Sequence, residues 1–420
     1  MQKIASIILA AGEGTRMKSS MSKVLHPVCN RPMINHSIDA INSIGIKNII
    51  LVVGHKADQV KKALPGFSFV MQKEMLGTGD AVLRTKNIVL KDRSIDSVLV
   101  SCGDSPLLTG ATLKKVVDKH IATRSGCTLL TAKLKNPTGY GRILRREDDK
   151  VVGIVEELDA DIYSKVNEEI NVGVYCFKKD MLFDALSKLK PNNKKNEYYL
   201  TDVIEILAKT DILVNSVSTD DIDEFLGVNT RKDLAKANHV ANIRIMNRLM
   251  EEGVTIVDPL NTYIEEGVEV GKDTIIYPYT FIEKNVKIGS RCKIGPSARL
   301  RPGTVIDDEV KIGNFAELVR SHVGKHSRVN HQCYIGDTTI GKHVNIGAGT
   351  IIANYDGKHK YKTIIEDKAF IGSGSILVAP VKVGKGAVTG AGSVLTKNKN
   401  VPPGKIVVGV PARILKKHNV

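Results

Sequence analysis

An aliphatic residue recurs at every sixth position of the segment Val286-Lys-Ile-Gly-Ser-Arg-Cys-Lys-Ile-Gly-Pro-Ser-Ala-Arg-Leu-Arg-Pro-Gly-Thr-Val-Ile306. A hexapeptide repeat of this kind forms one side of a triangular coil, so about three repeats complete one turn of a parallel β-helix. Each coil can bury its apolar side only against its neighbours, so stacking creates the core. The segment therefore predicts a prism of stacked coils.

The same period extends on both sides of this segment. It is unbroken from Ile264 to Leu318, slips by one residue at Val323 and again at Ile340, and resumes at Ile365. The residues Asp356–Lys362 interrupt the repeat and should form a loop that projects from the prism. Interruptions of this kind commonly carry function. We assign residues 253–420 to the β-helix.

The first half of the chain alternates β-rich runs with amphipathic helical stretches, which predicts an α/β domain with a mainly parallel sheet. The expected strands are Ile4–Ala11, Asn48–Val53, Ser97–Ser101 and Thr128–Ala132, and the expected helices include Pro32–Ile44, Lys56–Ala63 and Gly110–Arg124. The domain should span residues 1–229. A helical pattern without Gly or Pro over 230–252 predicts a connecting helix.

Composition excludes several classes of protein. The 420 residues are 42% hydrophobic and 25% charged, which is typical of soluble globular domains. The longest apolar runs are far shorter than the ~18–20 residues of a membrane span. The N-terminus predicts a first strand and not a cleavable signal, and six widely spaced cysteines favour reduced thiols. We expect a cytoplasmic protein.

The net charge of +16 permits either polyanion binding or a diffuse basic surface that attracts small anionic substrates. The basic residues are dispersed and mostly interleaved with acidic ones, Trp is absent, and few aromatic side chains are available to stack on bases. The second interpretation is therefore favoured, and no nucleic-acid partner is expected.

A glycine-rich turn, Leu9-Ala-Ala-Gly-Glu-Gly-Thr-Arg-Met17, follows the first predicted strand. Small residues at such a turn let backbone N–H groups approach a phosphate chain, and Arg16 and Lys23 add positive charge. The segment is neither a Walker A loop nor a full dinucleotide fingerprint. An ordinary β–α turn is the alternative interpretation of this segment by itself.

The chain as a whole resembles the sugar-1-phosphate nucleotidyltransferases, and most closely the bacterial bifunctional N-acetylglucosamine-1-phosphate uridylyltransferase / glucosamine-1-phosphate acetyltransferases. The ordered motifs of the first half are the glycine-rich turn, Lys23-Val-Leu-His26, Gln72-Lys-Glu-Met-Leu-Gly-Thr-Gly79, Gly103-Asp-Ser-Pro-Leu107, Pro137-Thr-Gly-Tyr-Gly-Arg-Ile143, Ile154-Val-Glu-Glu157, Glu169-Ile-Asn-Val-Gly173, Glu197-Tyr-Tyr-Leu-Thr-Asp202 and Gly227-Val-Asn-Thr-Arg231. The resemblance implies an α/β nucleotidyltransferase (Rossmann-like) domain followed by a left-handed parallel β-helix.

The resemblance also implies roles for residues of the first half. Leu9, Ala10, Ala11 and Gly12 would hold the uridine nucleotide, Arg16 and Lys23 its phosphates, and Gln72, Gly77 and Thr78 the uracil. Asp104 and Asn229 would coordinate Mg²⁺, which prefers oxygen ligands. The sugar would contact Gly141, Glu156 and Asn171. Taken singly, such residues have structural explanations, for example a helix cap at Asp104, and only the ordered series favours the functional interpretation.

The first half departs from the family pattern at a few positions. Met21-Ser22 replaces the family's Leu-Pro, and Cys102 stands where a tyrosine is usual. Leu158 replaces a lysine and Val172 a threonine. These changes leave the metal ligands and the glycine-rich turn in place, but Leu158 would alter how the sugar is enclosed.

In the repeat region, His331 lies two residues after a core aliphatic residue and hence at the surface of a coil. A histidine can take the proton from an amine as that amine attacks a thioester, although a lone surface histidine is the simpler interpretation. Resemblance makes His331 the general base that acts on glucosamine-1-phosphate. The sugar phosphate would be held by Arg301, Tyr334, Asn345 and Lys360, and acetyl-CoA by Ala348, Asn354, Tyr355, Ser373 and Ala391.

Two features of this second site differ from the family. Val319 replaces a lysine that helps bind the sugar phosphate, and spacing alone does not let Arg320 take its place. The closing segment Val407-Val-Gly-Val-Pro-Ala-Arg413 resembles that of other hexapeptide acyltransferases.

The leading hypothesis is a bifunctional enzyme that makes UDP-N-acetylglucosamine from glucosamine-1-phosphate, acetyl-CoA and UTP for envelope polysaccharide, assembled as a homotrimer. One alternative is a uridylyltransferase whose β-helix is only a trimerising scaffold. Others are a related nucleotidyltransferase for another sugar phosphate and a non-catalytic regulatory subunit.

Overall fold

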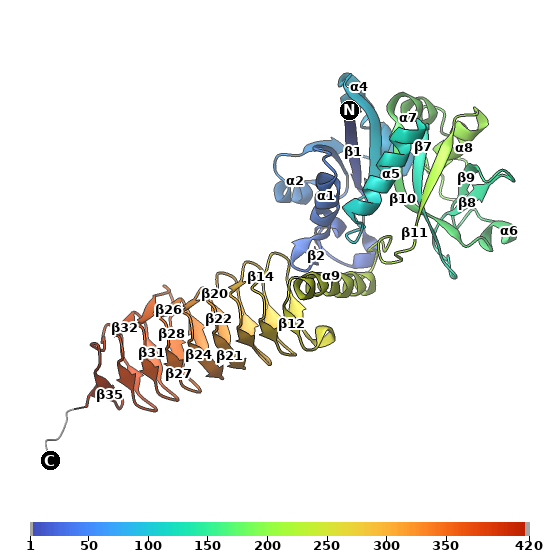
Figure 1. Ribbon diagram of the computed structural model, residues 1–420. Coiled ribbons are helices and arrows are strands. Elements are labelled where there is room, and N and C mark those ends of the chain that lie inside the picture. Colours follow the sequence, from blue (N-terminus) through green and yellow to red (C-terminus); the bar gives the residue numbers. More distant parts are fainter. Residues whose placement is uncertain (1–2, 416–420) are drawn as a thin grey trace, which may run out of the picture. The chain divides into compact units, whose positions relative to one another are not determined.

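The computed structural model describes residues 3–415, and the chain separates between Val240 and Ala241 into two compact units (Figure 1). In the first unit the main path of the sheet has the strand order β11-β7-β10-β6-β1-β4-β5. All neighbours in this path are parallel except β10, which runs antiparallel to β6 and β7. The predicted mainly parallel sheet is therefore confirmed.

The predicted strands and helices occur with ends shifted by at most two residues. The strands of this unit are β1 (Lys3–Ala10), β2 (Pro27–Val28), β3 (Arg31–Pro32), β4 (Asn48–Val53), β5 (Ser68–Met71), β6 (Ile95–Cys102), β7 (Cys127–Lys133), β8 (Arg142–Arg145), β9 (Val151–Val155), β10 (Glu169–Lys178) and β11 (Val214–Thr219). Its α-helices are α1 (Met33–Ser43), α2 (Ala57–Ala63), α3 (Thr78–Leu83), α4 (Lys86–Lys91), α5 (Gly110–Thr123), α6 (Ile162–Lys165), α7 (Lys179–Leu186) and α8 (Asp202–Lys209). The predicted connecting helix is α9 (Arg231–Glu251), which begins in the first unit and ends in the second.

Strand β1 is an interior strand of this sheet. It lies between the parallel strands β4 and β6, and the side chains of Ala5, Ile7 and Ile8 are fully buried. Strands covered on both faces are continuous apolar runs, which explains the sequence of this segment. The glycine-rich turn therefore emerges at the carboxyl ends of the parallel strands, where ligands bind in open α/β sheets.

The second unit is a prism with three faces, each a sheet of parallel strands from successive coils. The first face is formed by β12 (Thr255–Ile256), β15 (Ile275–Ile276), β18 (Lys293–Ile294), β21 (Lys311–Asn314), β24 (Arg328–His331), β27 (Asn345–Ile346), β30 (Phe370–Ile371), β33 (Val388–Thr389) and β35 (Ile406–Val408), with the antiparallel β36 (Arg413–Ile414) at its end. The second face is formed by β13 (Tyr263–Ile264), β16 (Phe281–Ile282), β19 (Arg299–Leu300), β22 (Glu317–Val319), β25 (Tyr334–Gly336), β28 (Ile351–Ala353), β31 (Ile376–Val378) and β34 (Val394–Leu395). The third face is formed by β14 (Glu269–Val270), β17 (Lys287–Ile288), β20 (Val305–Ile306), β23 (His322–Val323), β26 (Thr338–Ile340), β29 (Thr363–Ile365) and β32 (Val381–Val383).

The register explains the frame slips seen in the sequence. Ile275 pairs with Lys293 and Lys293 with Lys311, at a spacing of 18 residues, whereas Lys311 pairs with Arg328 at a spacing of 17. Each slip in the period is thus a coil that is one residue shorter. The predicted interruption, Asp356–Lys362, lies between β28 and β29, and an isolated bridge between Tyr355 and Lys360 closes its base. The predicted loop is confirmed.

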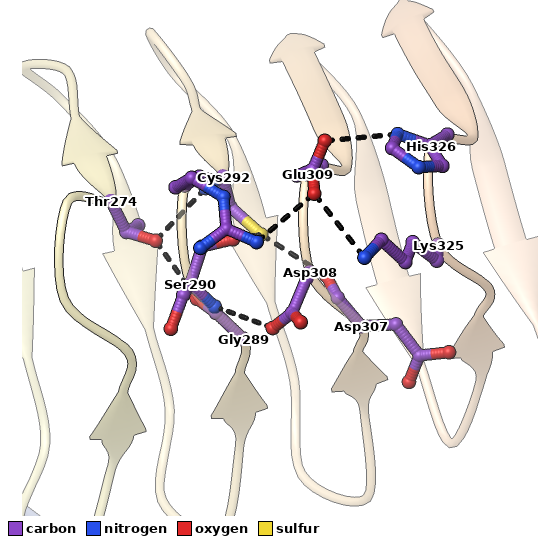
Figure 2. Close-up of polar contacts among 10 residues, drawn as sticks. Thr274, Gly289, Ser290, Cys292, Asp307, Asp308, Glu309, Lys325 and His326 are labelled. Carbon is purple, nitrogen blue, oxygen red and sulfur yellow. Dashed lines mark hydrogen bonds and ion pairs between the residues drawn. The ribbon is translucent and has the colours of Figure 1, made fainter.

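Several polar groups of the prism bond between adjoining coils. Glu309 contacts Arg291 at 3.0 Å, Lys325 at 3.3 Å and His326 at 3.2 Å, all from adjoining coils (Figure 2). Inside, the hydroxyl of Thr274 donates to the carbonyl of Gly289 and accepts from the N–H of Cys292. Exposed ion pairs contribute little individually, so the aliphatic interior carries most of the stability.

Candidate functional sites

A cavity of about 250 Å³ lies at the carboxyl end of β1. Its lining includes nine residues predicted from the sequence: Leu9, Ala10, Ala11, Gly12, Lys23, Gln72, Gly77, Thr78 and Asp104. Val24, Met75, Ala81, Cys102 and Glu197 also line it. The residues added by the structure are mostly apolar, so the sequence held no chemical signal for them. Glu197 begins the motif Glu197–Asp202, which by itself assigns it no role.

The wall opposite the glycine-rich turn is shaped by a backbone that only glycine can adopt. Gly77 has φ +109°, and a Cβ there would lie 2.5 Å from the carbonyl oxygen of Tyr198. The side-chain amide of Gln72 donates to the carbonyl of Gly77 at 3.0 Å and to Asp80 at 2.9 Å. The hydroxyl of Thr78 accepts the N–H of Leu200 at 3.0 Å. These bonds fix the predicted uracil-side residues in one arrangement.

Four predicted phosphate and metal residues converge at one point. The ammonium of Lys23 contacts a carboxylate oxygen of Asp104 and lies 3.2 Å from the amide oxygen of Asn229. The guanidinium of Arg16 donates to that same amide oxygen at 3.0 Å. Oxygens of Asp104 and Asn229 thus both contact the Lys23 ammonium, and the Asn229 oxygen also contacts Arg16. Asn229 is fixed at the start of α9, where its N–H donates to Asp233 at 3.0 Å.

The predicted sugar residues also converge, beside the hairpin β8–β9. The N–H of Asn171 donates to the carbonyl of Gly141 at 2.9 Å, and a Cβ at Gly141 would lie 3.5 Å from a carboxylate oxygen of Glu156. Burial raises the pKa of Glu156, which accepts a hydrogen bond from Thr201 at 3.1 Å. Leu158, the departure noted in the sequence, is half exposed.

Cys102 occupies the cavity wall where the family carries a tyrosine. Burial, together with the nearby charge of Asp104, raises the pKa of its thiol to about 12. The thiol is therefore neutral at physiological pH and adds no charge beside the phosphates.

On the prism, His331 ends β24 at the edge between the first and second faces. Its Nδ1 lies 2.9 Å from the side-chain oxygen of Asn314, which is the residue paired with it in the preceding coil. Because an amide oxygen can only accept, Nδ1 donates, and in the neutral imidazole the other ring nitrogen, Nε2, is an acceptor. This arrangement is suited to a general base.

Three of the predicted acetyl-CoA residues continue the same edge. Val329, Ile346, Ile371 and Thr389 pair in succession along the first face, and His331, Ala348, Ser373 and Ala391 each follow two residues later. Ser373 and Ala391 are exposed, and the carbonyl of His331 accepts the N–H of Gly349 at 3.0 Å.

A second group lies at the opposite edge of the second face. Asp337 accepts two hydrogen bonds from Arg320, at 2.6 and 2.8 Å, and one from Asn354 at 2.5 Å. These contacts, with a contribution from Lys360, lower the pKa of the Asp337 carboxyl. The hydroxyl of Tyr334 lies 3.0 Å from the position that a Cβ of Gly336 would take, beside Asn354.

The remaining predicted residues of the second site are placed as follows. Arg301 follows β19 and pairs with Glu317 at 2.8 Å. Asn345 lies on the first face between Arg328 and Phe370 of adjoining coils. Tyr355 is exposed at the base of the loop. Val319, which replaces the family lysine, is buried.

A larger, more open hollow of about 610 Å³ on the prism contains none of the predicted site residues. Its lining includes Glu269, Lys287, Asp307, Asp308, Lys325 and Lys342. Acidic and basic side chains both line it: Lys287 pairs with Glu269, and Lys325 pairs with Glu309 (Figure 2). We interpret this hollow as a structural feature formed by ion pairs between adjoining coils.

Comparison with known proteins agrees with this architecture. The model of the nucleotidyl transferase family matches residues 5–231, and that of the bacterial transferase hexapeptide (six repeats) matches residues 285–320 and 362–397. The predicted nucleotidyltransferase domain followed by a left-handed β-helix of hexapeptide repeats is thereby confirmed. No helix within residues 3–415 is long and apolar enough to cross a bilayer.

Curated relatives match along almost the whole chain. The bifunctional protein GlmU of Heliobacterium modesticaldum is 44% identical and covers 97% of this chain and 96% of its own. That of Geobacillus sp. (strain WCH70) is 42% identical, with coverage of 100% and 98%. A crystal structure of a putative glucose-1-phosphate thymidylyltransferase from Bacillus anthracis is 21% identical, with TM-score 0.47, and covers 57% of this chain and 95% of that one.

Proposed function

The chain belongs to the family of bifunctional GlmU proteins, and on that premise we propose how its two units divide the synthesis of UDP-N-acetylglucosamine. The prism transfers the acetyl group of acetyl-CoA to glucosamine-1-phosphate. The α/β unit joins the resulting N-acetylglucosamine-1-phosphate to UMP from UTP and releases pyrophosphate.

In the α/β unit, a phosphate oxygen of the sugar attacks the α-phosphorus of UTP, and the bond to pyrophosphate breaks. Catalysis of such transfers consists mainly of positioning and of neutralising charge on the phosphate oxygens. Arg16 and Lys23 supply that charge at the end of β1, while Gln72, Gly77 and Thr78 hold the base. Gly141, Glu156 and Asn171 orient the sugar. The convergence of Arg16, Lys23, Asp104 and Asn229 at one point carries this assignment.

The residues present fit a magnesium ion. Asp104 and Asn229 offer two oxygen atoms that already face one cationic group, the Lys23 ammonium. Mg²⁺ takes oxygen ligands, often one or two from protein, with water and phosphate completing the octahedron. When bound there it would neutralise charge that develops on the phosphates. Lys23 would then turn from Asp104 toward the nucleotide, and Asn229 would stay fixed by Asp233.

On the prism, the amine of glucosamine-1-phosphate attacks the thioester carbonyl of acetyl-CoA, and the coenzyme leaves as a thiol. Nε2 of His331 accepts the proton from the amine, because Asn314 holds the proton-bearing Nδ1 away from the substrate. Ala348, Asn354, Tyr355, Ser373 and Ala391 form the acetyl-CoA side. The sugar phosphate is held by Arg301, Tyr334, Asn345 and Lys360, without a cation at Val319.

The enzyme is further proposed to act as a homotrimer in the cytoplasm. Flat prism faces bury well against copies of themselves, and the outward side chains of Phe281 and Ile351 on the second face are exposed in the single chain. Sedimentation equilibrium should give the mass of a trimer, and a monomeric mass would contradict this assembly.

Paired assays on one preparation test the division of labour. Pyrophosphate release is measured with UTP and N-acetylglucosamine-1-phosphate, and thiol release with acetyl-CoA and glucosamine-1-phosphate. Asp104→Ala should abolish only the first, and His331→Ala only the second. If Val319 has left the prism as a mere scaffold, the wild-type protein will release pyrophosphate but no thiol.

A further inference from the structure

Arg142 is a charged side chain in the interior of the α/β unit. Only 2% of its side chain is exposed, and its Nη2 lies 2.8 Å from a carboxylate oxygen of Glu157. Its Nη1 donates to the carbonyl of Tyr140, and within residues 3–415 its buried Nε has no hydrogen-bond partner. Burying a charge is costly unless the charge is paired and hydrogen-bonded. An exposed side chain at this position would not carry this cost of burying a charge.

The Arg142–Glu157 ion pair holds the turn that precedes β8 in place. The same oxygen of Glu157 that binds Arg142 also accepts the N–H of Gly139 at 3.2 Å. Arg142 and Glu157 together therefore hold the N–H of Gly139 and the carbonyl of Tyr140, the two groups that lead into Gly141. The hydrogen bond from Arg142 is the main cause of the lowered pKa of Glu157.

The position of Arg142 in the sheet connects the predicted sugar residues. Along the chain Arg142 follows Gly141, and across the sheet it pairs with Val155 on one side and with Ile170 on the other. Glu156 and Asn171 are the next residues after those two partners. Each of the three proposed sugar contacts thus adjoins Arg142 or one of its strand partners.

We propose that Arg142 and Glu157 form a clamp that positions Gly141, Glu156 and Asn171 for the N-acetylglucosamine moiety without touching it. The inference rests on the proposed uridylyltransferase function. Both members are positioning residues, and loosening the clamp weakens binding of the sugar while leaving the nucleotide cavity around Gly77 and Asp104 unchanged.

Glu157→Gln is the decisive variant, because it keeps the size of the side chain and removes the charge that Arg142 requires. Isothermal titration calorimetry measures binding of UDP-N-acetylglucosamine and, separately, of UTP. We expect the affinity for UDP-N-acetylglucosamine to fall about tenfold, since small displacements of positioning groups have effects of at least this size. The affinity for UTP should stay within about twofold. Arg142→Lys, which keeps the charge but has fewer donors, should give a smaller loss.

Glu169→Gln is the matched control. Glu169 pairs with Arg145 at 2.7 Å in the same three-stranded region, so its loss removes an ion pair of equal chemistry away from the turn. The thermal unfolding midpoint of each preparation reports whether its α/β unit is folded. Equal losses for both ligands, no loss in Glu157→Gln, or the same selective loss in Glu169→Gln would overturn the clamp. If the wild-type protein binds UDP-N-acetylglucosamine no better than UDP, the proposed function fails instead.

Discussion

Asn314 should control the acetyltransferase through the orientation of His331. Nδ1 of His331 lies 2.9 Å from the side-chain oxygen of Asn314. A neutral hydrogen bond contributes about 0.5–1.5 kcal/mol, which corresponds to roughly a 2- to 12-fold change in the population of correctly oriented, Nδ1-protonated rings. Asn314→Ala should therefore lower kcat for thiol release by that factor. Pyrophosphate release should not change.

Asn314→Asp tests the same hydrogen bond to His331 in a second way. The carboxylate keeps an acceptor for Nδ1 and also stabilises the protonated imidazole. The acid limb of the pH–rate profile for thiol release should then move to higher pH, while the rate at alkaline pH stays near that of wild type. Gln332→Asn, an exposed neighbour on the same corner, is the control. An unchanged rate in Asn314→Ala, or an unmoved profile in Asn314→Asp, would refute the role given to His331.

The other predictions concern the α/β unit. Burial, with repulsion from Glu205, Glu156 and Asp159, raises the pKa of Asp202 from 3.8 to about 6. The folded state therefore favours the neutral carboxyl, and stability is lost as pH rises from near 4 to about 6, with no further loss from this group at higher pH. Asp202→Asn should therefore raise Tm at pH 8 by roughly 2–4 °C, for about 1 kcal/mol after allowance for partial solvent screening, and should have no effect at pH 4. Lys23→Gln should lower uridylyltransferase kcat about 100-fold, because it removes a positive charge beside the phosphates. The same change should tighten Mn²⁺ binding to the nucleotide-free protein, measured by electron paramagnetic resonance, because the ammonium no longer competes for Asp104 and Asn229. Gly77→Ala should abolish tight UTP binding because its Cβ would meet Tyr198, whereas Gly45→Ala, at φ +85° with open space around it, should change only stability, which thermal melting would report.

The fold could be predicted because both units are periodic. The sixfold period fixes which side chains face the interior of the prism, and Ile276, Ile294 and Ile312 are all buried as it requires. The apolar run of β1 followed by glycines likewise predicts an interior strand, and a cavity lies at its carboxyl end. These signals are local, so a single sequence carries them.

The sequence proposes candidate residues for the sites but not the contacts between them. Asn314 and His331 are 17 residues apart, and only the register of a shortened coil brings them together. The convergence of Gly141, Glu156 and Asn171 likewise depends on the pairing of β8 with β9 and β10. The burial of Arg142 could not be foreseen, because arginine is mostly an exposed residue and its ion pair is visible only in three dimensions.

The central claim is that the two units carry independent sites on one chain. The most direct test supplies glucosamine-1-phosphate, acetyl-CoA and UTP together and measures UDP-N-acetylglucosamine by mass spectrometry. Asp104→Ala and His331→Ala proteins should each form none, and an equimolar mixture of the two should restore its formation. A mixture that stays inactive, or either variant forming the product by itself, would contradict the claim.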